Sequence, residues 1–399
     1  MNPNPEKTTE PETQRLPSTV LRFGWIAFFT DVATEMAYPL LPAFLIALGS
    51  GAQALGIMEG VAESISAAVK WWSGKESDRA RARKPYVVAG YAIATFIRPA
   101  LALATKPFHV ILVRSIDRVG KGVRAAPRDA LVAASVPEER RGAAFGFERM
   151  MDNLGAVFGP MIAFSLARAG VPLRTIFATT IFPGLIAMAI VIGLREKARD
   201  PSEIKPIRDR REPRPRGEDQ KIIPISAGVK KYLFVVAIFS LGASADSFLI
   251  FRMLDLGLPI ALAPIVWLSL NASKSALNIP GGKIADRFGK KKTLVVGWTI
   301  YAAAYALFPL THSVSITWAL IVAYGAYYGL AEVGEKALIA ELADPASRGR
   351  SYGAFHAVTG FVVLPANALF GYLYSAHAAL AFGLSSICAF FAAVLLAFV

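Results

Sequence analysis

Twelve long apolar stretches restrict what this chain can fold into. Each is about 20 residues or longer, enough to cross the hydrocarbon core of a bilayer as a helix. The chain has 399 residues, of which 54% are apolar and only 18% are charged, whereas soluble domains carry roughly 25% charged residues. The sequence therefore predicts an all-α membrane protein with twelve transmembrane helices. The stretches lie near 21–48, 54–73, 86–104, 108–133, 143–168, 175–194, 232–254, 258–279, 293–310, 314–342, 352–375 and 380–399.

One long polar stretch divides the twelve segments into two groups of six. Residues 195–231 are rich in Arg, Pro and Glu and have no apolar periodicity, which is typical of a flexible linker. The first 18 residues have no apolar core, so we expect a disordered cytoplasmic tail rather than a signal peptide. We predict a tail at 1–18, a six-helix bundle at 19–194, a cytoplasmic linker at 195–231 and a second bundle at 232–399.

Lysine and arginine gather in alternate loops, and this asymmetry orients the chain. The linker holds twelve of them, five lie between residues 75 and 84, and five lie between residues 283 and 292. The opposite loops are nearly bare. Basic loops stay in the cytoplasm, so both termini and the linker are predicted to be cytoplasmic. The formal charge of +14 is then explained by loops beside anionic lipid, and no nucleic-acid partner is predicted.

The two halves are related by an internal repeat. A shift of 208 residues places Gly74, Asp78 and Arg79 on Gly282, Asp286 and Arg287. A shift of 207 residues aligns identical residues of 122–146 with residues of 329–353. Repeated six-helix halves are typical of transporters whose binding site lies between the halves.

The fourth segment carries a row of five cations. Arg114, Arg118, Lys121, Arg124 and Arg128 are three or four residues apart, so they share one face of a helix. Five cations cannot face lipid. They must line water or meet acids, and the sequence leaves open whether they serve transport or form a structural ion-pair network.

Acidic side chains in the first two segments lie at matching depths. At 1.5 Å per residue, Asp31, Glu63 and Arg118 all fall near the middle of the membrane. Burial favours the neutral carboxylic acid and a nearby arginine favours the carboxylate, so such a group can load and release a proton near neutral pH. Asp31 and Glu63 are our preferred proton carriers, with permanent salt bridges as the alternative. The predicted proton-coupling and substrate-cavity residues are Asp31, Glu35, Glu59, Glu63, Arg114, Asp117, Arg118, Lys121, Arg124, Arg149 and Asp152.

The second half carries fewer charged residues at membrane depth. Lys274 is predicted to pair with Glu332 or Glu335. Several tryptophans, Trp267 and Trp298 among them, are predicted to anchor the protein at the membrane interface. The residues expected to line the C-terminal side of the cavity are Asp246, Asn271, Lys274, Glu332, Glu335 and His356.

The sequence shows no catalytic constellation. It contains no phosphate-binding loop and no cluster of His and Cys, so we expect neither ATP-driven pumping nor a metal site. Cys388 is the only cysteine, which excludes an internal disulfide. We predict that the protein is not an enzyme and has no cofactor.

Three motifs resemble those of the major facilitator superfamily. The stretch Gly282-Lys-Ile-Ala-Asp-Arg-Phe-Gly289 is similar to its loop signature, and the N-terminal copy has Arg81 in place of the second glycine. Residues 118–126 resemble the helix-4 pattern, with Lys121 replacing Gln and Arg124 replacing Gly. The stretch Gly155-Ala-Val-Phe-Gly159-Pro160 resembles an element of superfamily exporters that exchange substrate for protons.

This resemblance implies a carrier built from two pseudo-symmetric six-helix bundles that works by alternating access. It implies that Arg118 is linked to proton movement and that the paired loops form a conformational latch. The predicted latch residues are Gly74, Asp78, Arg79, Gly282, Asp286 and Arg287.

We therefore predict a proton-coupled exporter of a small molecule. We expect it to work as a monomer in the lipid bilayer of a prokaryotic cytoplasmic (inner) membrane. One alternative is an importer or facilitator of an organic anion, bound by the cations of the fourth segment. A non-transporting membrane sensor is a further alternative, which the paired loop motifs disfavour.

Overall fold

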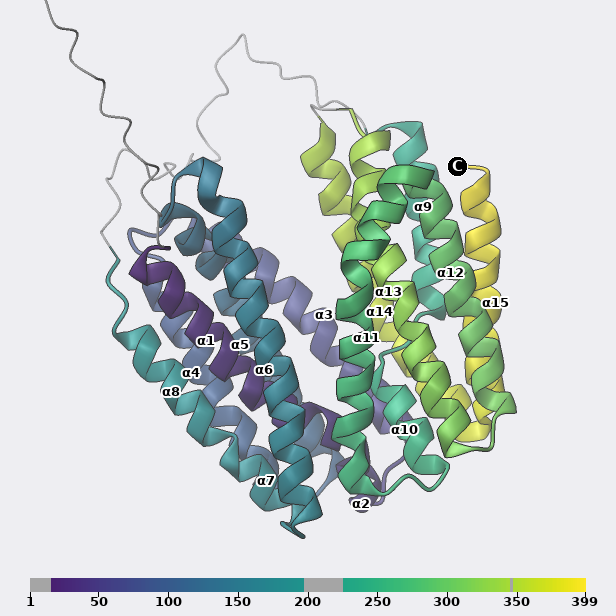
Figure 1. The fold of residues 1–399 in the computed structure, drawn as a ribbon, viewed down its shortest axis with the longest axis horizontal. Helices are drawn as coiled ribbons and strands as arrows, with labels where there is room; N and C mark the ends of the chain where they lie inside the picture. The colour runs from purple at the N-terminus through teal and green to yellow at the C-terminus, as the bar shows by residue number, and fades with distance from the viewer. Residues whose placement is uncertain (1–15, 197–224, 345–346) are drawn as a thin grey trace, which may run out of the picture.

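The computed structural model describes residues 16–196, 225–344 and 347–399, and these ranges fold into helices without a strand (Figure 1). Nine helical stretches within them are long and apolar enough to cross a membrane. Three further long stretches, which begin at Ser18, Ala52 and Pro107, carry most of the acids and cations predicted for the N-terminal half. The predicted tail and most of the predicted linker lie outside the described residues.

The N-terminal half contains the helices up to residue 192. Their order is α1 (Ser18–Ala37), η1 (Tyr38–Leu40), α2 (Leu41–Ala47), α3 (Ala52–Ser77), α4 (Lys84–Ile97), η2 (Arg98–Leu103), α5 (Pro107–Ala134), η3 (Glu138–Arg140), α6 (Arg141–Arg168), α7 (Leu173–Thr179) and α8 (Ile181–Ile192).

The C-terminal half starts just inside the predicted linker. Its order is α9 (Ala227–Gly242), α10 (Ser247–Asp255), η5 (Ile260–Leu262), α11 (Ala263–Phe288), α12 (Lys290–Leu307), η6 (Phe308–Leu310), α13 (Val314–Leu342), α14 (Arg348–Ala376) and α15 (Ala378–Ala397).

The first and the seventh predicted segments are among those that are broken rather than continuous. The first is interrupted at η1, where Pro39 and Pro42 each lack the N–H that a continuous helix needs. The seventh is interrupted between α9 and α10. There the backbone N–H of Ser244 donates to the Tyr301 hydroxyl at 3.3 Å, and the backbone N–H of Ala245 donates to the side-chain carbonyl of Asn367 at 2.8 Å. Side chains of neighbouring helices thus replace the lost helical hydrogen bonds, as membrane burial requires.

The helices form two groups that meet at one end of the molecule (Figure 1). In the N-terminal half α1 packs on α6 and α5 packs on α3 and α4, while in the C-terminal half α11 packs on α13 and α12 on α15. The two halves join mainly where α3 packs on α14 and α6 on α11. In Figure 1 the two groups diverge toward the end where the C-terminus lies.

We call that end the basic end, because it holds the Lys- and Arg-rich connections between α3 and α4 and between α11 and α12. The contacts between the halves lie away from it. Gly56 and Gly60, in the first part of α3, face the backbone of Asn367 and Leu364 in α14. Glycine has no side chain, so the two backbones can approach closely.

Candidate functional site

A cavity of about 330 Å³ lies along the N-terminal half, with walls from α1, α5 and α6. It runs from Arg128 and Arg149, toward the basic end, to Tyr38 and Trp267, where the halves meet. Among the residues that the structure describes, Trp267 of α11 is the one from the C-terminal half that lines the cavity. The lining residues are Ala27, Thr30, Asp31, Thr34, Glu35, Tyr38, Tyr91, Arg98, Asp117, Arg118, Lys121, Arg124, Ala125, Arg128, Arg149, Asp152 and Trp267.

The row of cations on α5 faces this cavity. Its spacing places Arg118, Lys121, Arg124 and Arg128 in the cavity wall, while Arg114, one turn earlier, lines a smaller adjoining space. Cations in a membrane helix avoid lipid, so the polar face of α5 turns inward.

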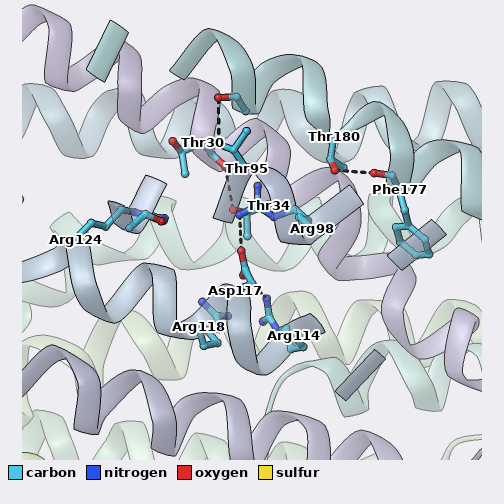
Figure 2. Close-up of polar contacts among 12 residues, drawn as sticks. Thr30, Thr34, Thr95, Arg98, Arg114, Asp117, Arg118, Arg124, Phe177 and Thr180 are labelled. Carbon is cyan, nitrogen blue, oxygen red and sulfur yellow. Dashed lines mark hydrogen bonds and ion pairs between the residues drawn. The ribbon is translucent and has the colours of Figure 1, made fainter. Parts of the chain in front are cut away.

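Asp117 lies at the centre of a buried ion-pair group. Arg98 of η2 donates to its carboxylate at 2.8 Å, and Arg114 lies 3.7 Å from it. Arg114 also lies 3.9 Å from Glu59. Figure 2 shows Arg98 on one side of Asp117 and Arg114 on the other. Arg98 is not among the residues predicted from the sequence, although a lone arginine within an apolar segment is a usable signal.

Most other charged groups of the cavity also have ion-pair partners. Arg118 lies 3.2 Å from Glu63, and Arg128 lies 3.0 Å from Glu148. Arg149 lies 3.6 Å from Asp152 on the same helix. Glu63, which we preferred as a proton carrier, is therefore the counter-ion of Arg118 in this conformation, and its side chain is 45% exposed.

Four charged residues of the cavity have no ion-pair partner in the part of the chain that the structure describes. They are two acids of α1, Asp31 and Glu35, and two bases of α5, Lys121 and Arg124. Glu35 accepts a hydrogen bond from the indole of Trp267. Arg124 lies over the ring of Tyr91, 4.4 Å from its centroid.

The two acids lie on the glycine pair of α6. A Cβ at Gly155 would lie 2.8 Å from the Asp31 Cβ, and a Cβ at Gly159 would lie 2.7 Å from the Glu35 Cβ. Real Cβ contacts are not that short. The Gly-x-x-x-Gly spacing therefore lets α6 pack directly on the face of α1 that carries both acids.

The C-terminal half contains a separate polar cluster around Asp246. Its carboxylate accepts hydrogen bonds from Lys274 at 2.5 Å, from Tyr324 at 3.0 Å and from Tyr328 at 2.9 Å. The predicted partner of Lys274 is Glu332 or Glu335, whereas its ion-pair partner among the described residues is Asp246, at the break between α9 and α10.

The other residues predicted for this side are more scattered. The Glu335 carboxylate accepts from the Trp298 indole at 3.4 Å, and the side chain of Glu332 lies outside the described part. Asn271 is half-buried, and His356 is exposed beside Phe355.

Two of the predicted interface tryptophans are buried instead. Trp298 is fully buried, with its ring stacked on Phe239 at a centroid distance of 4.4 Å. Trp267 is 7% exposed, and its ring meets Tyr38 edge-on at 4.8 Å. Both indole N–H groups find carboxylate acceptors inside the protein, so burial leaves neither one unpaired.

The predicted latch residues lie at the basic end, where the halves are apart. Asp78 accepts a hydrogen bond from Arg83 at 3.0 Å, an arginine of its own loop. Asp286 and Arg287 are exposed. Across the described ranges, no ion pair joins Asp286 to the N-terminal half.

The sequence profile of the Major Facilitator Superfamily matches residues 23–273 and 270–399. An uncharacterized MFS-type transporter of Methanocaldococcus jannaschii is 28% identical to the chain, over 99% of this chain and 98% of its own length. A multi-drug resistance efflux pump of Streptococcus pneumoniae is 29% identical over 39% of this chain and 40% of its own. The crystal structure of the D323A mutant of the nucleoside transporter NupG superimposes with a TM-score of 0.74 at 14% identity, over 96% of this chain and 98% of that one.

The chain therefore belongs to the Major Facilitator Superfamily. The predicted all-α architecture of two six-helix bundles is confirmed by this family match together with the fold shared with NupG. The family and fold are those of a multi-pass membrane transporter rather than an enzyme.

Proposed function

We propose that this protein is a proton-coupled exporter that moves a small solute by alternating access. The observation that carries the proposal is the pair Asp31 and Glu35, two carboxylates that face the cavity without a cationic partner among the described residues. A membrane carboxylate without a permanent partner is free to bind and release a proton. Asp117, held by two arginines, is not.

The position of the cavity supports outward transport in this proposal. We place the basic end in the cytoplasm of a prokaryotic cell, since basic loops stay on that side. The halves meet at the opposite end, so the cavity would receive its solute from the cytoplasm. Transport out of the cell then needs the halves to part at the outer end and close at the basic end.

The glycine pair of α6 supports exchange of solute for protons. Gly155 and Gly159 resemble an element of superfamily exporters, and they pack against the helix face that carries Asp31 and Glu35. A solute and a proton that compete for these acids would be carried in opposite directions. The similarity to an efflux pump over part of the chain agrees with this direction.

A second candidate function is uptake or facilitated passage of an organic anion. It is favoured by Lys121 and Arg124, two cavity cations without a carboxylate partner in the described ranges. Cations of this kind bind carboxylate or phosphate groups well.

The two candidates are separated by transport in proteoliposomes. A panel of labelled solutes is tested with an imposed pH gradient, with protein-free liposomes as the control. The proposal expects at least one solute to move faster against an inward flow of protons, and it expects a proton ionophore to abolish this acceleration. Transport that ignores both the gradient and the ionophore would contradict proton coupling.

A further inference from the structure

Some charged residues of the cavity have ion-pair partners among the described residues, and others have none. Its paired arginines, Arg98, Arg118, Arg128 and Arg149, each have an acid within 4 Å that counters their charge. The groups left over are Asp31 and Glu35 on α1 and Lys121 and Arg124 on α5. The cavity therefore offers two negative and two positive groups on two different walls.

These leftover groups are accessible in different degrees. Lys121 is exposed within the cavity wall, whereas Arg124 is only 8% exposed. The one hydrogen bond of the Arg124 guanidinium within the described residues is a long one, 3.4 Å to the Gly90 carbonyl. A buried guanidinium with unused donors is costly unless a ligand or water satisfies it.

We propose that the cavity binds a zwitterion, a small molecule whose cationic group is bound by Asp31 and Glu35 and whose carboxylate is bound by Lys121 and Arg124. A solute with one charge would pair with the charged groups of one wall only. It would also displace water from the charged groups of the other wall without replacing their hydrogen bonds. A zwitterion satisfies both walls and brings no net charge into the membrane.

The rest of the lining suits the hydrocarbon part of such a molecule. Tyr38, Tyr91 and Trp267 line the same cavity as the four charged groups, and aromatic rings provide large flat contact surfaces. The cavity volume of about 330 Å³ lies at the lower end of the range of known ligand pockets, about 300–1,000 Å³. A ligand the size of an aromatic amino acid fits these limits.

This inference rests on the proposed function and deepens it. The cationic group of a zwitterion would compete with a proton for Asp31, which is the competition that exchange requires. A simple organic anion would instead attract a proton to Asp31, and the two would travel together. The charge of the solute and the sign of proton coupling are thus linked.

The test is equilibrium binding to the purified full-length protein in lipid nanodiscs. Two series of probes share a ring and differ only in charge. The first series is 4-(aminomethyl)benzoate, 4-methylbenzoate and 4-methylbenzylamine. The second is L-phenylalanine, 3-phenylpropanoate and 2-phenylethylamine.

The inference expects the zwitterion of at least one series to bind about tenfold or more tightly than both of its singly charged analogues. Asp31→Asn and Lys121→Met should each weaken that zwitterion about tenfold. The anionic probe should be weakened only by Lys121→Met, and the cationic probe only by Asp31→Asn. Asp344→Asn and Lys106→Met are the matched controls, because both residues are exposed and lie outside the cavity. Neither control should change the affinity for any probe.

Two results would overturn the inference. One is that a singly charged probe binds as tightly as the zwitterion in both series, and the other is that no probe binds at millimolar concentration. The failure of the proposed function looks different. Gradient-driven transport of a singly charged solute would support proton coupling and contradict the zwitterion inference. Selective zwitterion binding, with transport that does not respond to the pH gradient, would support the inference and contradict proton coupling.

Discussion

At the scale of single residues, ion-pair partners divide the cavity acids into two kinds. Asp117 is 5% exposed and is held by Arg98 and Arg114. Asp31 lines the same cavity with no cation within ion-pair distance in the described ranges. The ion pairs of Asp117 stabilise the helix packing, whereas the carboxylate of Asp31 is left available to bind a proton or a solute.

The first prediction compares Asp117→Asn with Asp31→Asn. Neutralising Asp117 leaves the buried Arg98 without a counter-ion and Arg114 with Glu59 alone. Breaking a buried ion pair costs about 3–5 kcal/mol of stability, so the melting temperature and every transport mode should fall together. Asp31→Asn should keep the melting temperature and lose gradient-driven transport, while one-for-one exchange survives at solute concentrations high enough to offset the weaker binding. Melting curves and both transport assays on the same two preparations check this. A large loss of stability in Asp31→Asn would show that Asp31 is scaffolding.

Glu63→Gln extends this comparison to the other predicted proton carrier. Its carboxylate is Arg118's partner but is 45% exposed, so water can replace part of the lost interaction. We expect a smaller loss of stability than in Asp117→Asn. Preserved exchange without gradient-driven transport would support a role for Glu63 in proton coupling, and unchanged gradient-driven transport would exclude it.

The second prediction concerns Arg118. Arg118→Ala should leave folded protein in the membrane and abolish gradient-driven transport, because Glu63 loses the cation 3.2 Å away. Arg118→Lys should fail too, since a single ammonium cannot reproduce the planar fork of a guanidinium. Arg168→Ala, at the exposed end of α6, is the control for removal of an arginine. Coupled transport at the wild-type rate in Arg118→Ala would refute the assigned role.

At the scale of helices, the α1–α6 contact gives the third prediction. In Gly155→Ala the new methyl would lie 2.6 Å from the Phe28 carbonyl oxygen, so α1 and α6 must separate. We expect a loss of about 1–3 kcal/mol, as in other overpacked cores, and reduced transport because Asp31 moves with α1. Gly146→Ala on the same helix has open space around it and should have no effect. Equal behaviour of the two variants in melting and transport would contradict the packing argument.

The helices also show where sequence patterns stop being sufficient. Apolar length predicted the segments well, but not the breaks at η1 and between α9 and α10. Proline marks the first break, whereas no proline occurs in residues 243–246. That second break depends on Tyr301 and Asn367, which are distant in sequence and supply the missing hydrogen bonds.

At the scale of the whole molecule, one hydrogen bond links the two halves inside the cavity. The Trp267 indole of α11 donates to the Glu35 carboxylate of α1, and the Trp267 ring packs on Tyr38. The fourth prediction is that Trp267→Phe, which keeps a ring and loses the donor, shifts the population toward the form open at the outer end. Labelling of cysteines placed near the outer end, in a Cys388→Ser background, measures this shift.

Trp298→Phe is the matched control for this prediction. It removes a similar indole-to-carboxylate hydrogen bond, to Glu335 at 3.4 Å, but within the C-terminal half. Its labelling pattern should stay that of the parent. An equal shift in both variants would point to a general loss of packing rather than to a link between the halves.

The fifth prediction concerns the latch at the basic end. Asp286 is exposed while the halves are apart there, so its charge can act only in the form that is closed at the basic end. Asp286→Asn should therefore favour the conformation described here and reduce labelling at the outer end, because a ligand or charge shifts an equilibrium only by its differential effect on the two forms. Unchanged labelling in both Asp286→Asn and Asp78→Asn would contradict the latch hypothesis.

Sequence patterns were sufficient to predict the class of fold, the internal repeat and the row of cations on α5. These follow from short-range rules: apolar length sets membrane helices, and a spacing of three or four residues sets a shared helix face. The sequence also identified Asp31, Lys121 and Arg124 as cavity residues, and they line the cavity together.

Which of these charges are paired depends on how the helices pack in three dimensions. Arg98 binds Asp117, Asp246 binds Lys274, and Glu35 binds Trp267 across the halves. An ion pair depends on atoms within about 4 Å, and depth along a helix leaves the rotation and packing of that helix undetermined. The partners of each charge, and so the groups left for a solute and a proton, are set by how α1, α5, α6 and α11 pack together.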